Sequence, residues 1–258
     1  EIVPKEEQKN EFGSDVYHGG LVLRSHASLD PARYHQGILT LAIDSDVSII
    51  SNSRVVDLKR SAGKFELMTT EGDFVAREVI IATNGYTGKL TPWLRRRVIP
   101  IGSYMIATEP INRDLMNELM PKKRVVSDTR KVVYYYRPSP DGTRIIFGGR
   151  VTSGDSNSHK SGSLLRKELI RIFPQLSNIK ISHSWMGFVG FTFDHLPHTG
   201  VHDGIHYSMG YCGSGVSLSS YFGAKMGQRI AGLPEGKTAL DDLSFPTLSL
   251  IHISEPTR

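Results

Sequence analysis

The feature that most constrains this chain is a glycine-rich bend followed by a helix with small side chains along one face. Residues 210–215 have the sequence GYCGSG, and a helix is expected from about Val216 to Ala231. That helix carries a small residue at every fourth position: Ser219, Gly223, Gly227 and Ala231. A glycine inside a helix costs about 1 kcal/mol relative to alanine. Close packing on another backbone or sheet is therefore the best explanation of the stripe.

The bend itself is a candidate binding site. Glycines permit positive φ and let the backbone approach a ligand closely. The helix start that follows presents unpaired N–H groups and a partial positive charge. The segment therefore favours an anionic or electron-rich group, and an ordinary turn before a helix is the alternative.

A second candidate lies where a short apolar run ends in a polar turn. Val79-Ile80-Ile81-Ala82 has the character of a buried central strand, and Thr83-Asn84-Gly85 follows it. In open α/β sheets, ligands bind outside the carboxyl ends of the strands. A plain strand-to-turn junction explains the same pattern equally well.

Helices and strands are both predicted around these motifs. Asp30 is a suitable N-cap before Pro31, and apolar residues at i, i+4 and i+7 predict an amphipathic helix there. A second helix is predicted to end at Pro174. Strands are expected at 48–50, 55–58, 65–69, 74–75, 79–82, 99–108, 132–137, 144–149 and about 183–191.

Composition excludes several classes of protein. The chain has 258 residues, 39% of them hydrophobic, a net charge of +5 and one cysteine. No basic block suggests a nucleic-acid arm, and a single cysteine excludes a disulfide framework. No apolar run approaches the roughly 18 residues that span a membrane. The polar start EIVPKEEQKNEF is unlike a secretory signal. A cytoplasmic α/β protein is expected.

Other reactive side chains are assigned structural roles. Four closely spaced histidines suggest a metal, but Pro197, Gly200 and Gly204 interrupt any helix that would align them. No metal site is therefore predicted at His195, His198, His202 and His206. Cys212 lacks an evident base and is expected to be a loop or buried thiol.

Five segments occur in a characteristic order between about residues 30 and 235. They are LDPARYHQGI, then SRVVDLKRSAGKFELMTTEGDFVAREVIIATNG, then PIGSYMIATEP with YYYRPSPDGTRIIFGGR, then WMGFVGFTFDHLPHTG, and finally GYCGSGVSLSSYFGAKMGQRIAG. Together they resemble the flavin-dependent D-amino-acid oxidase superfamily, in its glycine oxidase, sarcosine oxidase and γ-glutamylputrescine oxidase branch. Glycerol-3-phosphate or succinate-type dehydrogenases share the Ala-Thr-x-Gly strand end but fit the closing segment less well.

The resemblance implies a fold that combines α/β and α+β parts. The family begins with a G-x-G-x-x-G unit that holds the pyrophosphate of FAD, and this sequence contains none. The chain is therefore expected to be the C-terminal portion of a longer protein and inactive alone. Residues 1–97 are expected to form a partial, Rossmann-like FAD-binding domain, and residues 98–185 an antiparallel substrate domain. Residues 186–245 return to the first domain, and residues 246–258 look like a non-native tail.

The resemblance also implies the cofactor residues. Val55 would lie near the adenine side of FAD, and Thr83, Asn84 and Gly85 near the cofactor. The flavin ring would face Gly213, Ser214, Gly215 and Val216. The implied reaction removes a hydride beside an amine, and the imine is then hydrolysed. Oxygen is the expected acceptor, and another electron acceptor is the alternative. No individual catalytic residue is assigned.

Residues that depart from the family's pattern narrow the range of expected substrates. Ser217 stands where sarcosine oxidases have a carboxylate-binding lysine. Val189 and Gly213 stand where glycine oxidases have arginines. Gly187 stands where some relatives attach flavin through cysteine, which implies non-covalent FAD. The sequence between Trp185 and Gly200 is most similar to the γ-glutamylputrescine oxidase type. The expected reaction is therefore oxidation of a C–N bond in an amine or amino-acid derivative, with an amine or polyamine derivative favoured.

Substrate contacts are less well defined. Tyr104, Tyr136 and Trp185 are candidate aromatic walls, and cation–π contact with the ammonium of an amine would suit them. Core packing is the alternative for each residue. Arg150 is a candidate partner for an anionic group, or a surface arginine. The rival function is a non-catalytic remnant or partner-binding domain that needs no cofactor.

Overall fold

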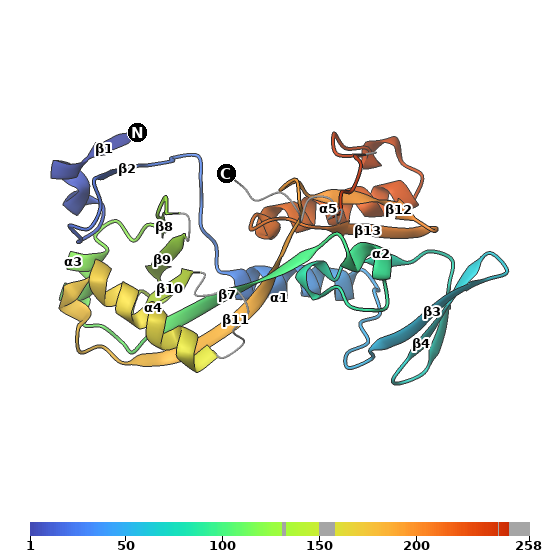
Figure 1. Ribbon diagram of the computed structural model, residues 1–258, viewed down its shortest axis with the longest axis horizontal. Coiled ribbons are helices and arrows are strands. Elements are labelled where there is room, and N and C mark those ends of the chain that lie inside the picture. The colour runs from blue at the N-terminus through green and yellow to red at the C-terminus, as the bar shows by residue number, and fades with distance from the viewer. Residues whose placement is uncertain (131–132, 150–157, 242, 248–258) are drawn as a thin grey trace, which may run out of the picture. The chain divides into compact units, whose positions relative to one another are not determined.

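The computed structural model describes residues 1–130, 133–149, 158–241 and 243–247 (Figure 1). The chain divides into two compact units. Unit 1 contains Glu1–Gly37 and Gly102–Gly187, and unit 2 contains Ile38–Ile101 and the chain from Phe188 onward. The chain therefore passes from one unit to the other more than once, as expected for interwoven domains.

Unit 1 is built on an antiparallel sheet with the strand order β11-β7-β10-β9-β8. Strands β7 and β11 begin or end in segments that belong to unit 2. Helices α3 and α4 belong to unit 1, and the short helix η3 follows α4. Their bounds, with those of the strands, are β7 Ile99–Thr108, α3 Arg113–Leu119, β8 Val126–Ser127, β9 Tyr134–Pro138, β10 Ile145–Gly149, α4 Ser158–Ile172, η3 Pro174–Leu176 and β11 Ile181–Phe191.

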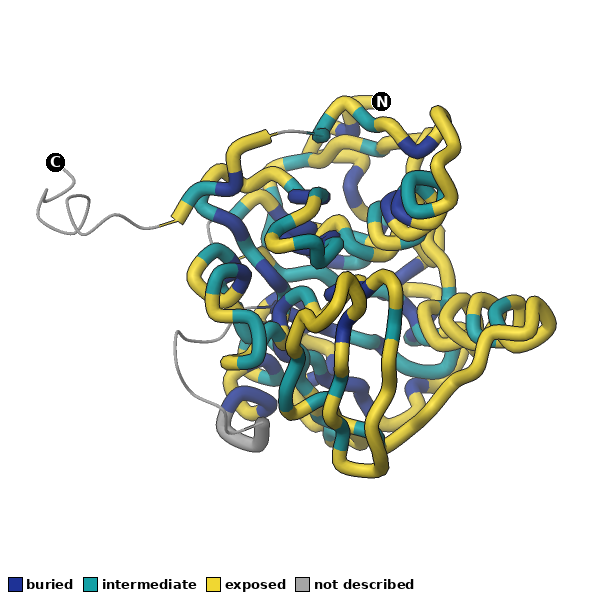
Figure 2. The backbone as a smooth tube through the Cα atoms, turned by 90° about the vertical axis from the view of Figure 1, so that its right-hand side faces the viewer, coloured by how far each residue is buried: buried dark blue, intermediate teal, exposed yellow. Residues whose placement is uncertain are grey.

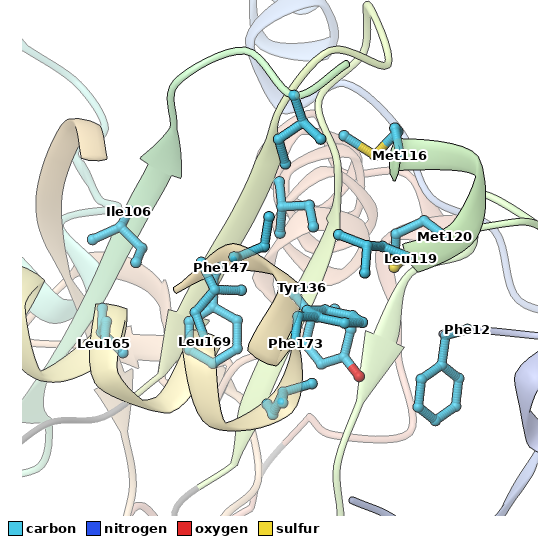
Figure 3. Close-up of a cluster of buried hydrophobic side chains, with 14 of the residues drawn as sticks. Phe12, Ile106, Met116, Leu119, Met120, Tyr136, Phe147, Leu165, Leu169 and Phe173 are labelled. Atoms are coloured by element: carbon cyan, nitrogen blue, oxygen red, sulfur yellow. The ribbon is translucent and has the colours of Figure 1, made fainter. Parts of the chain in front are cut away.

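The core of unit 1 lies between α4 and one face of this sheet. Leu165, Leu169 and Phe173 are fully buried against Phe147 and Tyr136 (Figure 3). Phe173 follows directly after α4, and Pro174 then begins η3. The predicted helix and its end are therefore confirmed. The helix ends here because proline lacks the N–H that would continue it.

Residues 1–37 belong to unit 1, although they had been expected in the FAD-binding part. They contain β1 (Ile2–Pro4), η1 (Lys5–Asn10) and β2 (Gly19–Leu21). The segment is tied down by Phe12 in the core cluster and by the Ser14 hydroxyl, which donates to the carbonyl of Ile172 at 2.5 Å. These contacts link positions far apart in sequence, so local patterns do not predict them.

The helix predicted after Asp30 is confirmed as α1, Pro31–Asp44. The Asp30 carboxylate accepts hydrogen bonds from the N–H groups of Ala32 and Arg33, as an N-cap does. No residue of α1 is buried, so its apolar stripe contacts no core among the described residues. Figure 2 shows which parts of the backbone are buried, intermediate or exposed.

Unit 2 contains two three-stranded sheets, with the orders β12-β13-β6 and β3-β4-β5. A core of apolar and aromatic side chains, including Phe65, Ile81, Leu94 and Met209, packs within the unit. The bounds of its elements are β3 Val55–Ser61, β4 Lys64–Thr69, β5 Asp73–Ala76, β6 Ile80–Ile81, η2 Asn84–Tyr86, α2 Pro92–Arg95, β12 His198–His202, β13 Ile205–Met209, α5 Gly215–Ile230 and η4 Pro234–Gly236.

Two predictions in unit 2 need correction. Residues 48–50 form no strand, and Ile49 and Ile50 are 54% and 55% exposed. Strand β6 is shorter than expected and pairs only with β13 among the described strands, with Ile80 exposed. An apolar triplet is too short to establish a strand without a pairing partner.

Helix α5 confirms the prediction of a closing helix. Its stripe of small residues is exposed, and a Cβ added at Gly223 or Gly227 would meet no atom within 4 Å. The backbone or sheet expected against this stripe is therefore not among the described residues. Within the described part of the chain, no helix combines the length and apolar character that crossing a bilayer requires.

Candidate functional site

The candidate site in unit 2 lies at the carboxyl ends of two parallel strands. Strand β6 pairs in parallel with β13, with Ile80 opposite His206 and Ile81 opposite Tyr207. Parallel strands end at the same edge of a sheet. The turn that follows β6 and the glycine bend that follows β13 are therefore brought together, at the kind of edge where α/β proteins bind ligands.

A hydrogen bond joins the two segments directly. The Gly210 N–H donates to Oδ1 of Asn84 at 2.9 Å. Both residues have positive φ, 44° at Asn84 and 79° at Gly210. Glycine adopts such angles freely, and asparagine does so more readily than most side chains. The residue types at both positions thus fit the backbone that the contact requires.

A third segment, at the end of β11, packs against the same turn. A Cβ at Gly85 would lie 2.7 Å from the carbonyl oxygen of Phe188, and one at Gly190 would lie 2.3 Å from Oδ1 of Asn84. Cβ atoms do not come this close to a backbone oxygen, so Gly85 needs to be glycine, and a side chain at Gly190 would have to displace the Asn84 carboxamide. The absence of two side chains allows the three segments to meet.

Cys212 helps to hold the bend. Its N–H donates to the carbonyl of Gly190 at 3.0 Å, and its φ is 52°. Its thiol lies 3.4 Å from the Thr192 hydroxyl and donates to the Gly210 carbonyl at 3.2 Å. These contacts give the cysteine a structural role in the bend, in line with the expectation of a loop thiol.

The start of α5 is open. Gly213, Ser214 and Val216 are exposed, and a Cβ at Gly213 would meet no atom within 4 Å. Ser214 is the N-cap residue, yet its side chain caps none of the first-turn N–H groups of the described helix. Such N–H groups, together with the helix dipole, favour a negatively charged or electron-rich partner.

Tyr211 holds the bend in place through contacts with β13 and α5. Its ring stacks on Phe222 of α5, and its hydroxyl lies 2.9 Å from that of Ser208. Burial raises the pKa of Tyr211 above its ordinary value, because the charged form would lose its hydration. The residue therefore stays neutral and acts as a structural support between β13 and α5.

The predicted cofactor residues do not all lie together. Asn84 and Gly85 lie in the turn that contacts the bend, and the four residues at 213–216 form the open start of α5. Thr83 is exposed, and its hydroxyl lies 2.8 Å from that of Thr87. Val55 belongs to the other sheet of unit 2, where it pairs with Thr69.

The predicted substrate residues of unit 1 do not share one face of the sheet. Tyr104 and Tyr136 are 3% and 2% exposed and belong to the core cluster on the α4 side. Burial also raises the pKa of Tyr136 far above its ordinary value. Core packing is the role that the structure gives both rings. Trp185, on β11, is 42% exposed, and Arg150 lies outside the described residues.

The opposite face of the same sheet carries polar groups that sequence analysis did not single out. The hydroxyls of Ser103 and Tyr135 are hydrogen-bonded to each other across β10. Gly148 lies between them and pairs with both Met105 and Tyr135. A Cβ there would be 2.1 Å from Sδ of Met105 and 2.4 Å from Cε2 of Tyr135. Alternation within residues 134–136 places Tyr135 and Tyr136 on opposite faces, and the register with Gly148 identifies Tyr135 as the one on this face.

The histidines have separate partners. Nε2 of His198 lies 3.0 Å from the Asp194 carboxylate, and its ring stacks on Phe245. His202 stacks on Trp93, and His206 contacts Glu78. No group of three or more potential metal ligands comes together in the described part of the chain.

The chain is similar in sequence to known oxidoreductases. A family model described as FAD dependent oxidoreductase matches residues 1–229. The chain is 32% identical over 250 residues to a probable oxidoreductase, OrdL, of Haemophilus influenzae, covering 95% of this chain and 57% of that protein. It is 31% identical over 243 residues to gamma-glutamylputrescine oxidoreductase of Escherichia coli, covering 91% and 55%. The chain thus spans little more than half the length of these relatives.

Solved structures share the fold. Glycine oxidase from Geobacillus kaustophilus has a TM-score of 0.80 at 19% identity, covering 96% of this chain and 66% of that one. L-proline dehydrogenase from P. horikoshii has a TM-score of 0.75 at 18% identity, covering 93% and 66%. The combined α/β and α+β architecture is confirmed by this likeness.

Proposed function

The chain belongs to the family of FAD-dependent oxidoreductases, and we propose that the full-length protein oxidises a C–N bond of a small amine derivative. The observation that carries the proposal is the meeting of the β6 turn with the glycine bend ahead of α5. A relative of the chain is named for the oxidation of gamma-glutamylputrescine, an amine derivative. We propose a substrate of that class rather than a free amino acid.

The residues of the bend fit FAD. The start of α5 is exposed and uncapped by Ser214 among the described residues, and no atom fills the space beside Gly213. FAD, when bound, supplies the acceptor for the hydride removed from the carbon beside the nitrogen. The N–H groups of the first turn of α5 would stabilise negative charge on the reduced ring. Asn84 and Gly85 would fix the turn beside it.

We propose that FAD is held non-covalently. Gly187 occupies the position where some relatives use a cysteine. The Cys212 thiol is already engaged with the Gly210 carbonyl and lies close to the Thr192 hydroxyl. Nothing in this pattern calls for a bond to the flavin. Val55 and Thr83 are proposed as further cofactor contacts.

The face of the unit 1 sheet opposite α4 is proposed to contact the substrate. Its polar groups include the hydroxyls of Ser103 and Tyr135, which are hydrogen-bonded to each other. Hydroxyls that share one hydrogen bond retain a donor and free lone pairs, so the pair can bind an uncharged polar group. The positions where relatives have carboxylate-binding cations hold Ser217, Val189 and Gly213. The absence of a cation at these three positions favours an amine over a carboxylate.

Assay of the purified full-length protein tests the proposal. We expect a yellow protein with flavin absorbance that produces hydrogen peroxide when amines are oxidised in air, with the imine product hydrolysed to a carbonyl compound. Activity with amino acids alone would overturn the substrate class. A folded but colourless full-length protein, with no absorbance change on addition of FAD, would instead favour a non-catalytic, partner-binding role.

A further inference from the structure

We infer that Asn84 is a positioning residue that fixes where α5 begins, because its side-chain carbonyl holds the backbone of the glycine bend. Its predicted role was contact with the cofactor. The structure commits Oδ1 of Asn84 to the N–H of Gly210, at 2.9 Å. The consequence for the flavin rests on the proposed function, whereas the contact itself does not.

The residue type suits this role in two ways. Asn84 has φ of 44°, and asparagine is among the few side chains that occupy this region readily. Its short carboxamide supplies an acceptor to an N–H that is 126 positions away in sequence. Buried backbone N–H groups need a partner, so this acceptor stabilises the bend.

Gly190 provides independent support, because it leaves the space that the carboxamide fills. A Cβ at Gly190 would lie 2.3 Å from Oδ1 and 3.0 Å from Cγ of Asn84. The carbonyl of the same glycine accepts the Cys212 N–H at 3.0 Å. Gly190 therefore leaves room for the Asn84 side chain, and its carbonyl also binds the Cys212 N–H within the bend.

The position of the bend determines where helix α5 begins. Gly210 and Cys212 are both held by hydrogen bonds to neighbouring segments, and the N–H of Ser214 donates to the Tyr211 carbonyl at 2.9 Å. Little freedom remains between Gly210 and the first residue of α5, Gly215. Loss of the Asn84 contact is therefore expected to shift the first turn of α5, whose N–H groups carry the positive end of the helix dipole.

The direct test is hydrogen exchange at the Gly210 amide in the full-length protein. Asn84→Gly removes the carboxamide without disfavouring positive φ, and should speed exchange about five- to tenfold, the ratio expected for one hydrogen bond. Asn84→Asp keeps an acceptor and should preserve the protection. Thr87→Val is the matched control in the same turn: it removes a hydroxyl that donates to the Asn84 carbonyl and should leave Gly210 unchanged. Unchanged exchange in Asn84→Gly would overturn the inference.

A double-mutant cycle tests the role of Gly190. Gly190→Ala should displace the carboxamide and raise Gly210 exchange as Asn84→Gly does. Because the displaced atoms are absent from Asn84→Gly, the double variant should show little further increase. Independent, multiplying effects of the two substitutions would show that the carboxamide is not what Gly190 accommodates, and would contradict the inference.

The midpoint potential of the bound flavin tests the functional consequence. Asn84→Gly should make this potential more negative, because the helix N-terminus no longer lies where it stabilises the reduced ring, while Thr87→Val should not change it. An unchanged potential alongside faster Gly210 exchange would overturn the claim that Asn84 acts through α5. Absence of flavin from the parent protein would instead refute the proposed function and leave the exchange result valid.

Discussion

Gly148→Ala is predicted to weaken substrate binding as well as the fold. The added Cβ would lie 2.1 Å from Sδ of Met105 and 2.4 Å from Cε2 of Tyr135. Overpacking of this kind costs about 1–3 kcal/mol. The atoms in the way belong to side chains that can rotate, so a loss of unfolding free energy at the lower end, about 1 kcal/mol, is expected. That rotation should separate the Tyr135 hydroxyl from Ser103.

The effect on binding follows from that separation. A neutral hydrogen bond contributes about 1 kcal/mol, so KM for the amine should rise about fivefold if the displaced pair no longer binds it. Gly149→Ala is the matched control, because its Cβ would approach Tyr134 on the core-facing side, at 2.5 Å from Cδ1. The assays are urea unfolding and steady-state kinetics of the full-length protein. If the two alanine variants raised KM equally, or if Gly148→Ala left KM unchanged, Tyr135 would not be a substrate contact.

Three further predictions concern the fold and the cofactor. Leu169→Ala, at a fully buried site on α4, should lower the unfolding free energy by about 2–5 kcal/mol, whereas the exposed Leu164→Ala should change it by less than about 1 kcal/mol; equal losses in urea unfolding would contradict the assigned core. Burial opposes ionisation of Asp194, but hydrogen bonds from His198 and from the Leu196 N–H outweigh it and hold the pKa of Asp194 below its ordinary value. Its contribution to stability is therefore present above the unfolded pKa and lost as the pH falls through the folded one, so Asp194→Asn should destabilise at pH 7 and have little effect in strong acid, as urea midpoints at the two pH values would show. Acid precipitation of the full-length protein should leave all flavin in the supernatant. A yellow pellet would contradict non-covalent binding, and loss of its colour in Cys212→Ser would locate the bond at that thiol.

Local signals in the sequence predicted the helices well. Asp30 caps α1, and Pro174 follows the residues that end α4, because capping and the missing proline N–H act within one turn. Non-local contacts were beyond such signals. Nothing near Ser14 indicates that its hydroxyl bonds to Ile172, 158 positions later. Phe12 likewise joins a cluster whose other buried members lie at Tyr104 and beyond.

Two of the three tyrosines of β9 show the same limit at the level of a single residue. Alternation establishes that Tyr135 and Tyr136 point to opposite faces, but not which of them faces the core. That choice depends on the register with β10, where Gly148 pairs with Tyr135 and Phe147 pairs with Tyr136. Phe147 is fully buried, so its partner is buried with it, and the glycine leaves the other face for Tyr135.

The candidate cofactor site depends on a pairing that the sequence implies only indirectly. Strands β6 and β13 are separated by more than a hundred residues, and their parallel alignment brings the turn after one to the bend after the other. Each motif, taken alone, is compatible with an ordinary turn. The register between Ile81 and Tyr207 places Asn84 within reach of Gly210, and the glycines at 85 and 190 allow the backbones to meet. The chemistry proposed for the open start of α5 therefore depends on groups that lie outside the helix and determine its position.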